Sequence, residues 1–145
     1  NLTYVHGPVA VSDCLFCQIS AGTLKAEVVH ETPEAIAFLD RFPAAKGHVV
    51  VIPRAHAASL PELDDAAVGG LFRAVKDVMR KVTAALAPAG MNVGWNHGKP
   101  AGQHVFHLHV HVLPRFHEGG RGVQVLGEGT GKVGLAELGE LIRRA

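Results

Sequence analysis

Histidines alternate with apolar residues close to position 110, and their imidazoles are the side chains of this sequence best suited to chemistry. His107, His109 and His111 are separated by the single residues Leu108 and Val110. Because successive side chains of a β-strand point to opposite faces of a sheet, this spacing predicts three imidazoles on one face and apolar side chains on the other. A polar face that is merely solvated would rarely consist of three histidines, so we interpret the cluster as functional.

Two kinds of chemistry fit three neighbouring imidazoles. They could bind a metal ion, since a His-x-His pair in a strand can direct two nitrogens at one ion. Alternatively, one imidazole could be a nucleophile while its neighbours fix its tautomer and bind the anion that it attacks. A histidine with a pKa near about 6.5 is mostly neutral at pH 7, so it has a lone pair for either role.

A short glycine-flanked loop precedes the histidines. Gly98 and Gly102 stand on either side of Lys99, Pro100 and Ala101. Small residues let backbone N–H groups approach a phosphate closely, so the loop favours a nucleophilic histidine acting on a phosphate. A glycine loop alone is a weak signal.

The two cysteines form one close pair. Cys14 and Cys17 have the Cys-x-x-Cys spacing, which is typical of metal binding or thiol redox chemistry, and two buried free thiols are the third interpretation. A secreted disulfide scaffold would contain more cysteines, so we expect a cytoplasmic location.

Composition limits the other classes of function. The 145 residues carry 14 basic and 13 acidic side chains, and 48% of them are hydrophobic against 19% charged. This balance predicts one globular domain with a sizeable core and gives no support to a polycation that coats nucleic acid. The apolar runs are far shorter than the roughly 18 residues of a membrane span, and we expect neither a membrane nor a nucleic-acid partner.

The order of predicted elements favours an α+β fold with an antiparallel sheet. A Ser-x-x-Glu capping box at Ser59 is expected to begin one long helix, and Pro88 and Gly90 to end it. We predict a helical turn at 14–20, strands at 28–31, 35–40, 48–53, 91–96 and 105–113, a long helix ending near 86 and a last helix at 135–144. The domain is expected to span residues 14–116, between an N-terminal arm (1–13) and a glycine-rich C-terminal tail (117–145).

The region around the histidines resembles the signature of the histidine-triad (HIT) superfamily. The matching stretch is AGQHVFHLHVHVLPR at residues 101–115, preceded by Asn96 and Gly98. The resemblance extends upstream through CLFC at 14–17, AFLD at 37–40, GHVVVIPR at 47–54 and His56. It therefore covers nearly the whole chain from 14 to 115, and the triad with these flanking residues is a highly specific motif.

The resemblance implies a homodimer with an antiparallel sheet, one long helix and short flanking helices, which binds a purine nucleotide similar to AMP. By position, His109 is the expected nucleophile, which attacks the α-phosphorus and forms a nucleotidyl-histidine intermediate. A carbonyl near His107 could hold the Nδ1 proton of His109. The expected nucleotide contacts are Asp40 and Arg41 at the ribose, and Asn96, Gly102, Gln103, His104 and His111 at the phosphate. Weaker candidates for the base pocket are Phe16, Ile19, Phe38 and Val50, for each of which plain core packing is the favoured role. His48 is expected either to support the histidine cluster or to be a structural histidine.

Family members with the same Cys-x-x-Cys pair resemble this chain at four positions that hold a structural zinc ion. Those positions are Cys14, Cys17, His56 and His107. Two thiolates and two imidazoles suit tetrahedral zinc, and the βαβ context of a redox dithiol is absent, so we predict zinc.

One position departs from the nucleotide-binding pattern. His104 stands where many relatives have Ser or Thr, so a hydroxyl that could serve the leaving group is replaced by an imidazole. We expect a hydrolase of nucleoside phosphoramidates or related α-substituted nucleotides. The alternatives are a dinucleoside polyphosphate hydrolase, a nucleotide-sensing module without catalysis, and a metallohydrolase in which the triad holds the metal.

Overall fold

The computed structural model describes residues 13–118, 122 and 134–145. Of the predicted N-terminal arm only Asp13 is described, and most of the glycine-rich part of the predicted tail lies outside the described residues. The predicted last helix is confirmed as α3 (Leu135–Arg144). Within the described part of the chain, no helix is long and apolar enough to cross a membrane.

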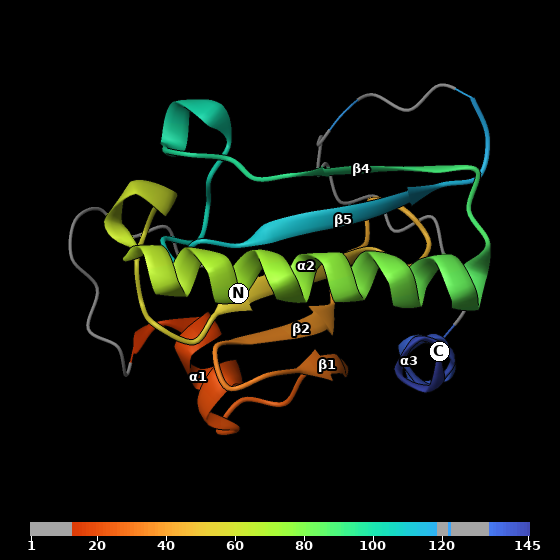
Figure 1. Ribbon diagram of the computed structural model, residues 1–145, viewed down its shortest axis with the longest axis horizontal. Coiled ribbons are helices and arrows are strands. Elements are labelled where there is room, and N and C mark those ends of the chain that lie inside the picture. Colours follow the sequence, from red (N-terminus) through yellow and green to blue (C-terminus); the bar gives the residue numbers. More distant parts are fainter. Residues whose placement is uncertain (1–12, 119–121, 123–133) are drawn as a thin grey trace.

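Five antiparallel strands form a single sheet. They are β1 (Val28–Glu31), β2 (Ala35–Leu39), β3 (Val49–Pro53), β4 (Gly90–Gly94) and β5 (Val110–Arg115). Their order across the sheet is β1-β2-β3-β5-β4, and every neighbouring pair is antiparallel (Figure 1). The predicted α+β class is confirmed, because the strands pair antiparallel instead of forming a parallel, doubly wound sheet.

The long helix begins five residues later than the capping box predicted. Helix α2 spans Asp65–Leu86, and the Asp64 carboxylate accepts a hydrogen bond from the Ala67 N–H at 2.8 Å. The Ser59 hydroxyl instead donates to the Glu62 carboxylate at 2.7 Å across a separate 3₁₀ turn, η2 (Leu60–Glu62). The Ser59 side chain therefore satisfies no free N–H group of a helix, whereas Asp64 caps α2, so the motif marked the wrong one of two adjacent turns.

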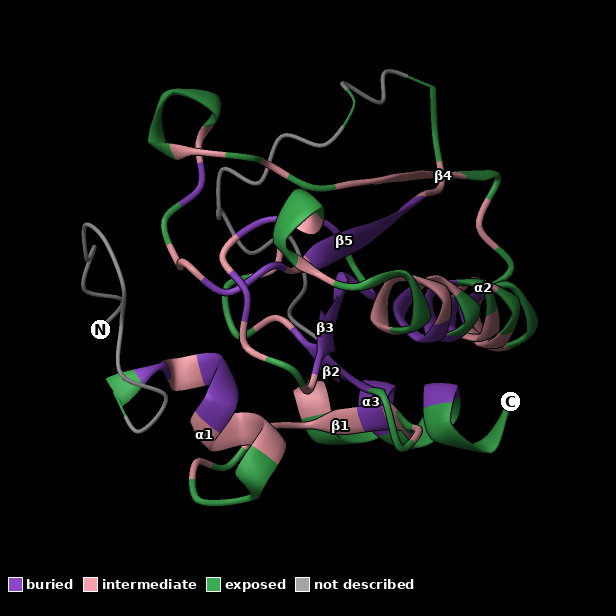
Figure 2. Ribbon diagram, turned by 60° about the vertical axis from the view of Figure 1, so that its left-hand side comes forward, coloured by how far each residue is buried: buried purple, intermediate pink, exposed green. Residues whose placement is uncertain are grey.

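Apolar side chains cover both faces of the sheet. On β2, Ala35, Ala37 and Leu39 pack in the cluster beneath α2, whereas Ile36 and Phe38 pack in a second cluster with α1 (Leu15–Ala21) on the other face. Figure 2 shows the buried central strands between these elements. A sheet covered on both faces explains why its strands read as continuous apolar runs.

The predicted histidine strand is only partly regular. A strand was expected over 105–113, but β5 begins at Val110, and β3 pairs with it only from Val49 to Val51. Beyond that point the Leu108 N–H donates to the Ala57 carbonyl at 2.7 Å, so the chain pairs with a loop instead of a strand. Alternation nevertheless persists, because Leu108, Val110 and Val112 all lie in the core beneath α2. A second 3₁₀ turn, η3 (Lys99–Ala101), lies in the glycine loop.

Replacing Leu71 by Ala should destabilise the fold far more than the same change at Leu141. Leu71 on α2 is 0% exposed in the core, whereas Leu141 on α3 is 52% exposed. Removing a fully buried leucine leaves a cavity and costs about 2–5 kcal/mol. Urea denaturation followed by circular dichroism measures both free energies of unfolding. Similar losses for the two variants would contradict the placement of the core.

Candidate functional site

A pocket of about 340 Å³ opens on the face of the sheet that carries α1. Its walls are mostly apolar, with a smaller polar part. The sequence-predicted residues that line it are Phe16, Ile19, Phe38, Asp40, Arg41, Val50, Asn96, Gly102, His104, His109 and His111. Residues predicted at widely separated positions therefore converge on one cavity. Gln103 is the one predicted nucleotide contact that does not line the pocket.

His109 is held in one tautomer at the pocket wall. Its Nδ1–H donates to the backbone carbonyl of His107 at 2.7 Å, as the sequence analysis anticipated. Burial lowers the pKa of His109, although the nearby Asp40 carboxylate opposes the change. A neutral ring whose proton is on Nδ1 has its lone pair on Nε2, so His109 has the electronic form of a nucleophile.

Asp40 lies directly after β2 at the rim of the pocket. Its Oδ1 accepts from the Phe42 N–H at 2.8 Å, and its own N–H donates to the His48 carbonyl at 3.0 Å. Burial raises the pKa of Asp40, against the opposing effects of the Phe42 N–H and of His109. Phe42 and Lys25 also line the pocket. Sequence analysis missed both residues; the position of Phe42 two residues after Asp40 was a usable signal, whereas nothing distinguished Lys25.

Gln103 holds the glycine loop in shape. Its side chain is 2% exposed; Oε1 accepts from the Gly98 N–H at 2.8 Å, and Nε2 donates to the Ala58 carbonyl at 2.8 Å. Gly102 has φ +101°, and a Cβ there would lie 3.5 Å from Nδ2 of Asn96. Glycine is favoured at this position because its backbone conformation is strained for other residues, whereas the 3.5 Å contact with the asparagine would be ordinary.

The backbone donors of this loop are already engaged in turns. The Gly102 N–H donates to the Lys99 carbonyl at 2.9 Å, and the Gln103 N–H donates to the Gly98 carbonyl at 3.1 Å. A phosphate at the loop would have to share these two donors. The side chains of the pocket wall thus become the more important source of hydrogen bonds to an anion.

Two buried histidines contact each other behind the pocket. Nε2 of His48 lies 2.9 Å from Nδ1 of His111, and the two residues are 1% and 3% exposed. His111 Nε2 is buried and has no hydrogen-bond partner among the described residues. His48 therefore supports the histidine cluster, the first of the two roles expected for it. Asp40, His48 and His111 are also close enough to form a ligand group, but the imidazole–imidazole hydrogen bond itself explains the approach of the two rings.

The four predicted metal ligands come together on the other side of the triad. The Nδ1 atoms of His56 and His107 are 3.3 Å apart, and Cys17 Sγ lies 3.2 Å from the first and 3.5 Å from the second. Cys14 Sγ lies 3.4 Å from His107 Nδ1. Tetrahedral zinc with ordinary bond lengths would separate two nitrogens by about 3.3 Å and a nitrogen from a sulfur by about 3.6 Å. The donor set therefore fits a tetrahedral ion closely.

The surroundings of these ligands bear on metal binding in two ways. Burial, together with the neighbouring Cys14, raises the pKa of the Cys17 thiol to about 12, so this thiol stays protonated unless a positive charge lies beside it. His107 Nε2–H donates to the Pro53 carbonyl at 2.7 Å, which leaves the Nδ1 lone pair facing the sulfurs. Such an outer hydrogen bond commonly orients a metal-binding histidine. Neither ligand group found among the described residues includes His109, so the geometry does not support a metallohydrolase in which the triad shares one ion.

The sequence matches a known family over most of its length. The family model described as HIT domain matches residues 21–118. An adenosine 5′-monophosphoramidase of Schizosaccharomyces pombe is 41% identical over 105 residues, which are 72% of this chain and 76% of that protein. An adenylylsulfatase of Arabidopsis thaliana is 31% identical over 111 residues, 77% of this chain and 56% of that protein.

Solved structures share the fold. A zinc-bound histidine triad family protein from Mycobacterium smegmatis superposes with a TM-score of 0.79 at 30% identity. The alignment covers 93% of this chain and 94% of that one. The arrangement of the sheet and the helices is therefore that of a recurring architecture.

The protein should lose stability as the pH falls from about 6.5 towards 4. Burial lowers the pKa of His48 to about 4 and that of His111 to about 3, from an ordinary value of 6.5. In this range the unfolded chain binds protons that the folded protein cannot accept, so the free energy of unfolding falls by roughly 1 kcal/mol per pH unit for each residue. Urea denaturation at several pH values measures the slope. It should become shallower in His48→Gln, and a wild-type slope near zero would contradict the burial of neutral imidazoles.

Proposed function

Because the chain belongs to the histidine-triad family, we propose that it hydrolyses purine nucleoside phosphoramidates or related α-substituted nucleotides. The observation that carries the proposal is the 2.7 Å hydrogen bond from His109 Nδ1 to the His107 carbonyl. It leaves the Nε2 lone pair on a residue that lines the pocket. The adenosine 5′-monophosphoramidase relative supports the substrate class.

The proposed reaction proceeds in two displacements at the α-phosphorus. In the first, His109 Nε2 forms a bond to phosphorus, the phosphorus–nitrogen bond of the substrate breaks, and the amine leaves with a proton taken from solvent. In the second, water attacks the nucleotidyl-histidine adduct, the bond between phosphorus and Nε2 breaks and returns the lone pair to Nε2, the nucleoside monophosphate is released, and the proton that water loses passes to solvent. Forming a covalent intermediate divides one difficult displacement into two easier ones.

The walls of the pocket divide into parts that suit the parts of a nucleotide. We assign the ribose hydroxyls to Asp40, whose carboxylate can accept two hydrogen bonds, with Arg41 beside it. The apolar wall formed by residues such as Phe16 and Phe38 suits a purine ring. We assign the phosphate to the groups around His109, namely Asn96, Gly102, Gln103, His104 and His111.

We also propose that Cys14, Cys17, His56 and His107 hold a structural zinc ion. A bound ion would provide the counter-charge that lets both thiols ionise, and it would link α1 to the segment that precedes β5. Its contribution to catalysis is indirect. His107 presents its ring to the ion and its carbonyl to His109, so holding the ring also holds the carbonyl that sets the tautomer of the nucleophile.

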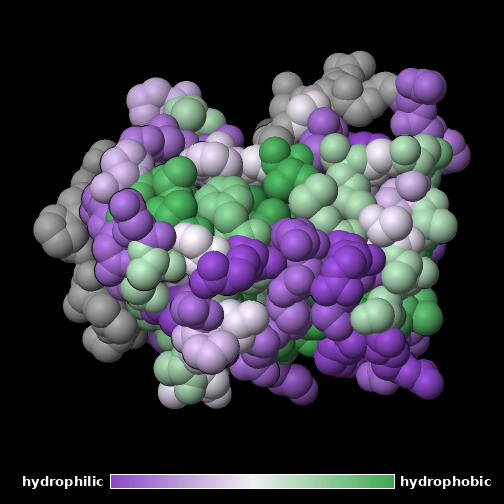
Figure 3. All heavy atoms as spheres, in the orientation of Figure 1, coloured by the Kyte–Doolittle hydropathy of each residue, from purple (hydrophilic) through white to green (hydrophobic). Residues whose placement is uncertain are grey.

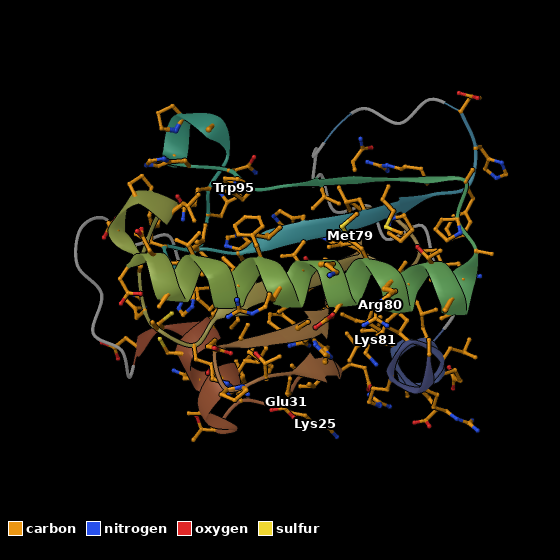
Figure 4. The ribbon with its side chains drawn as sticks, viewed as in Figure 1. Lys25, Glu31, Met79, Arg80, Lys81 and Trp95 are labelled. Atoms are coloured by element: carbon orange, nitrogen blue, oxygen red, sulfur yellow. The ribbon has the colours of Figure 1, made fainter. Side chains whose placement is uncertain are left out.

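A homodimer and a cytoplasmic location complete the proposal. Strand β4 lies at the edge of the sheet, and in Figure 3 apolar side chains gather between it and α2. Trp95 and Met79 lie in this region between β4 and α2 (Figure 4). Trp95 packs edge-on against Phe72. An open antiparallel edge beside apolar side chains suits pairing with a second copy of the chain. Two free buried thiols are consistent with a reducing compartment.

Replacing His109 by Ala should abolish turnover but preserve nucleotide binding. Removing a nucleophile lowers kcat by about 10³-fold or more, whereas the rest of the pocket is unchanged. Steady-state hydrolysis of adenosine 5′-phosphoramidate and of diadenosine tetraphosphate, assayed side by side, measures the loss and identifies the preferred leaving group. AMP affinity is measured separately by calorimetry.

His117→Ala is the matched control, since His117 is exposed and outside the pocket. This variant should hydrolyse both substrates at the wild-type rates. Absence of turnover by the wild type, together with normal AMP binding, would contradict the hydrolase and favour a nucleotide-sensing module. Equal activities of wild type and His109→Ala would contradict the assignment of the nucleophile.

Removing the metal should destabilise the protein. We expect about one zinc ion per chain by mass spectrometry, and a thermal midpoint lower by roughly 10 °C after chelation, because the energy of metal binding contributes directly to folding. His56→Ala should reduce both zinc content and midpoint, whereas His97→Ala, an exposed histidine outside the cluster, should change neither. A zinc-free protein that melts at the same temperature as the metal-loaded one would refute the structural site.

A further inference from the structure

Helix α3 lies beyond the residues that the HIT domain model matches, which end at 118. It is nevertheless built into the core. Leu138 is 4% exposed and Ile142 is 0% exposed, and both pack in the cluster beneath α2. The helix contacts α2, β1 and β2, and Figure 2 shows it beside β1. Because its apolar face is buried in this way, α3 is a fixed support from which its polar side chains can act on β1.

Arg143 reaches from the end of α3 to the beginning of β1. Its Nη1 donates to the Glu27 carboxylate and, at 2.7 Å, to the backbone carbonyl of Val28. Its Nη2 donates to the Glu140 carboxylate on α3 itself at 3.0 Å. Hydrogen bonds between a guanidinium and a carboxylate are stronger than bonds between neutral groups. The guanidinium therefore connects the helix to the strand through both a side chain and the backbone.

The backbone of α3 also comes close to Glu27. A Cβ at Gly139 would lie 2.6 Å from Cγ of Glu27, which is too short for a non-bonded contact. Gly139 precedes Arg143 by four residues, so the two positions share one face of the helix. Glycine at 139 thus lets this face of α3 approach the strand closely enough for Arg143 to reach the Val28 carbonyl.

The beginning of β1 needs such a support. This strand is the last one on its side of the sheet, and its register with β2 shifts between Val28 and His30, where the pairs are Val28 with Phe38 and His30 with Ala37. A shift of this kind interrupts the ladder of backbone hydrogen bonds. Arg143 donates to the Val28 carbonyl at this point, so α3 holds an edge that the sheet alone holds weakly.

The held segment continues into the wall of the pocket. Residues 24–26 line the pocket immediately before Glu27. The Glu27 carbonyl accepts a hydrogen bond from the Leu39 N–H at 3.0 Å, and Leu39 directly precedes Asp40, to which we assign the ribose. Strands β2 and β3 separate β1 from β5, which carries His111. A displacement of β1 would therefore reach the side of the pocket assigned to the nucleoside before the side assigned to the phosphate.

We propose that Arg143 is a positioning residue for the nucleoside end of the pocket, which is the wall formed by residues 24–26 together with Asp40. By holding Glu27 and the Val28 carbonyl, it fixes this wall without contacting the ligand. The inference rests on the proposed function for the identity of the ligand. It extends the nucleotide site to a helix that the family model does not include.

Replacing Arg143 by Ala should weaken binding of the nucleoside but leave the chemical step unchanged. We expect AMP and adenosine each to bind about 5-fold more weakly by calorimetry, because both ligands depend on the same wall. In hydrolysis of adenosine 5′-phosphoramidate, KM should rise by a similar factor. The value of kcat should stay that of the wild type, because His109 and the groups assigned to the phosphate are unchanged.

Two control variants separate positioning from a general loss of stability. Arg144→Ala is the matched control, because the Arg144 side chain is 75% exposed and faces Glu140 on its own helix. It should change neither affinity nor KM. Leu71→Ala removes a buried core contact instead, so it should lower the free energy of unfolding but leave KM unchanged at temperatures where the protein is folded. If Arg143→Ala also lowered stability while adenosine affinity and KM stayed normal, the proposal would be overturned.

A double substitution tests the route through β1. Glu27→Ala should raise KM in the same direction as Arg143→Ala. In an Arg143→Ala background it should add nothing, because the bond that it removes is already absent. Additive losses would overturn the route. If the wild type binds AMP and adenosine but hydrolyses nothing, the hydrolase fails, and calorimetry alone still decides the role of Arg143. Absence of adenosine binding by the wild type would refute the nucleoside end of the pocket and this role with it.

Discussion

His107 makes three contacts on which the arrangement of the site depends. Its ring Nδ1 faces the two cysteines and His56, its Nε2–H donates to the Pro53 carbonyl, and its own carbonyl accepts the Nδ1 proton of His109. The metal-ligand cluster and the nucleophile are therefore connected through one residue. A displacement of His107 would disturb both, because the carbonyl that orders His109 cannot move independently of the ring that faces the thiols.

Burial keeps the neighbouring histidines neutral, and hydrogen bonds to backbone groups then give them different tautomers. The pKa values of His48, His109 and His111 are all lowered, chiefly by desolvation, so each ring is neutral and has one donor and one acceptor. In water these tautomers would interconvert freely. Inside the protein the backbone selects between them, and the selection costs little because each ring has a partner at hydrogen-bond distance.

The sequence predicted the parts of this protein that depend on periodicity and residue type. Alternation along 107–111 placed the imidazoles opposite Leu108 and Val110. Residue type and spacing singled out the Cys-x-x-Cys pair, but it was the resemblance to the histidine-triad superfamily that added His56 and His107 to the ligand cluster. What the sequence could not show depends on backbone groups, which every residue carries. Nothing in the residue types indicates that β5 begins at Val110, because that outcome follows from tertiary pairing. Ser59 and Asp64 are both residue types that cap helices, so residue type alone does not choose between them.

The irregular stretch before β5 is what makes the site possible. In a regular antiparallel ladder, the carbonyls of Pro53 and His107 would accept hydrogen bonds from the N–H groups of a neighbouring strand. Here β3 and β5 pair only over Val49–Val51, so those carbonyls are free to accept from the rings of His107 and His109. The alternating pattern alone would predict that β5 extends back to residue 105. In that longer strand, the N–H groups of a neighbouring strand would compete with the imidazoles for the same carbonyl acceptors. The shorter strand thus follows from the same hydrogen bonds that set the tautomers.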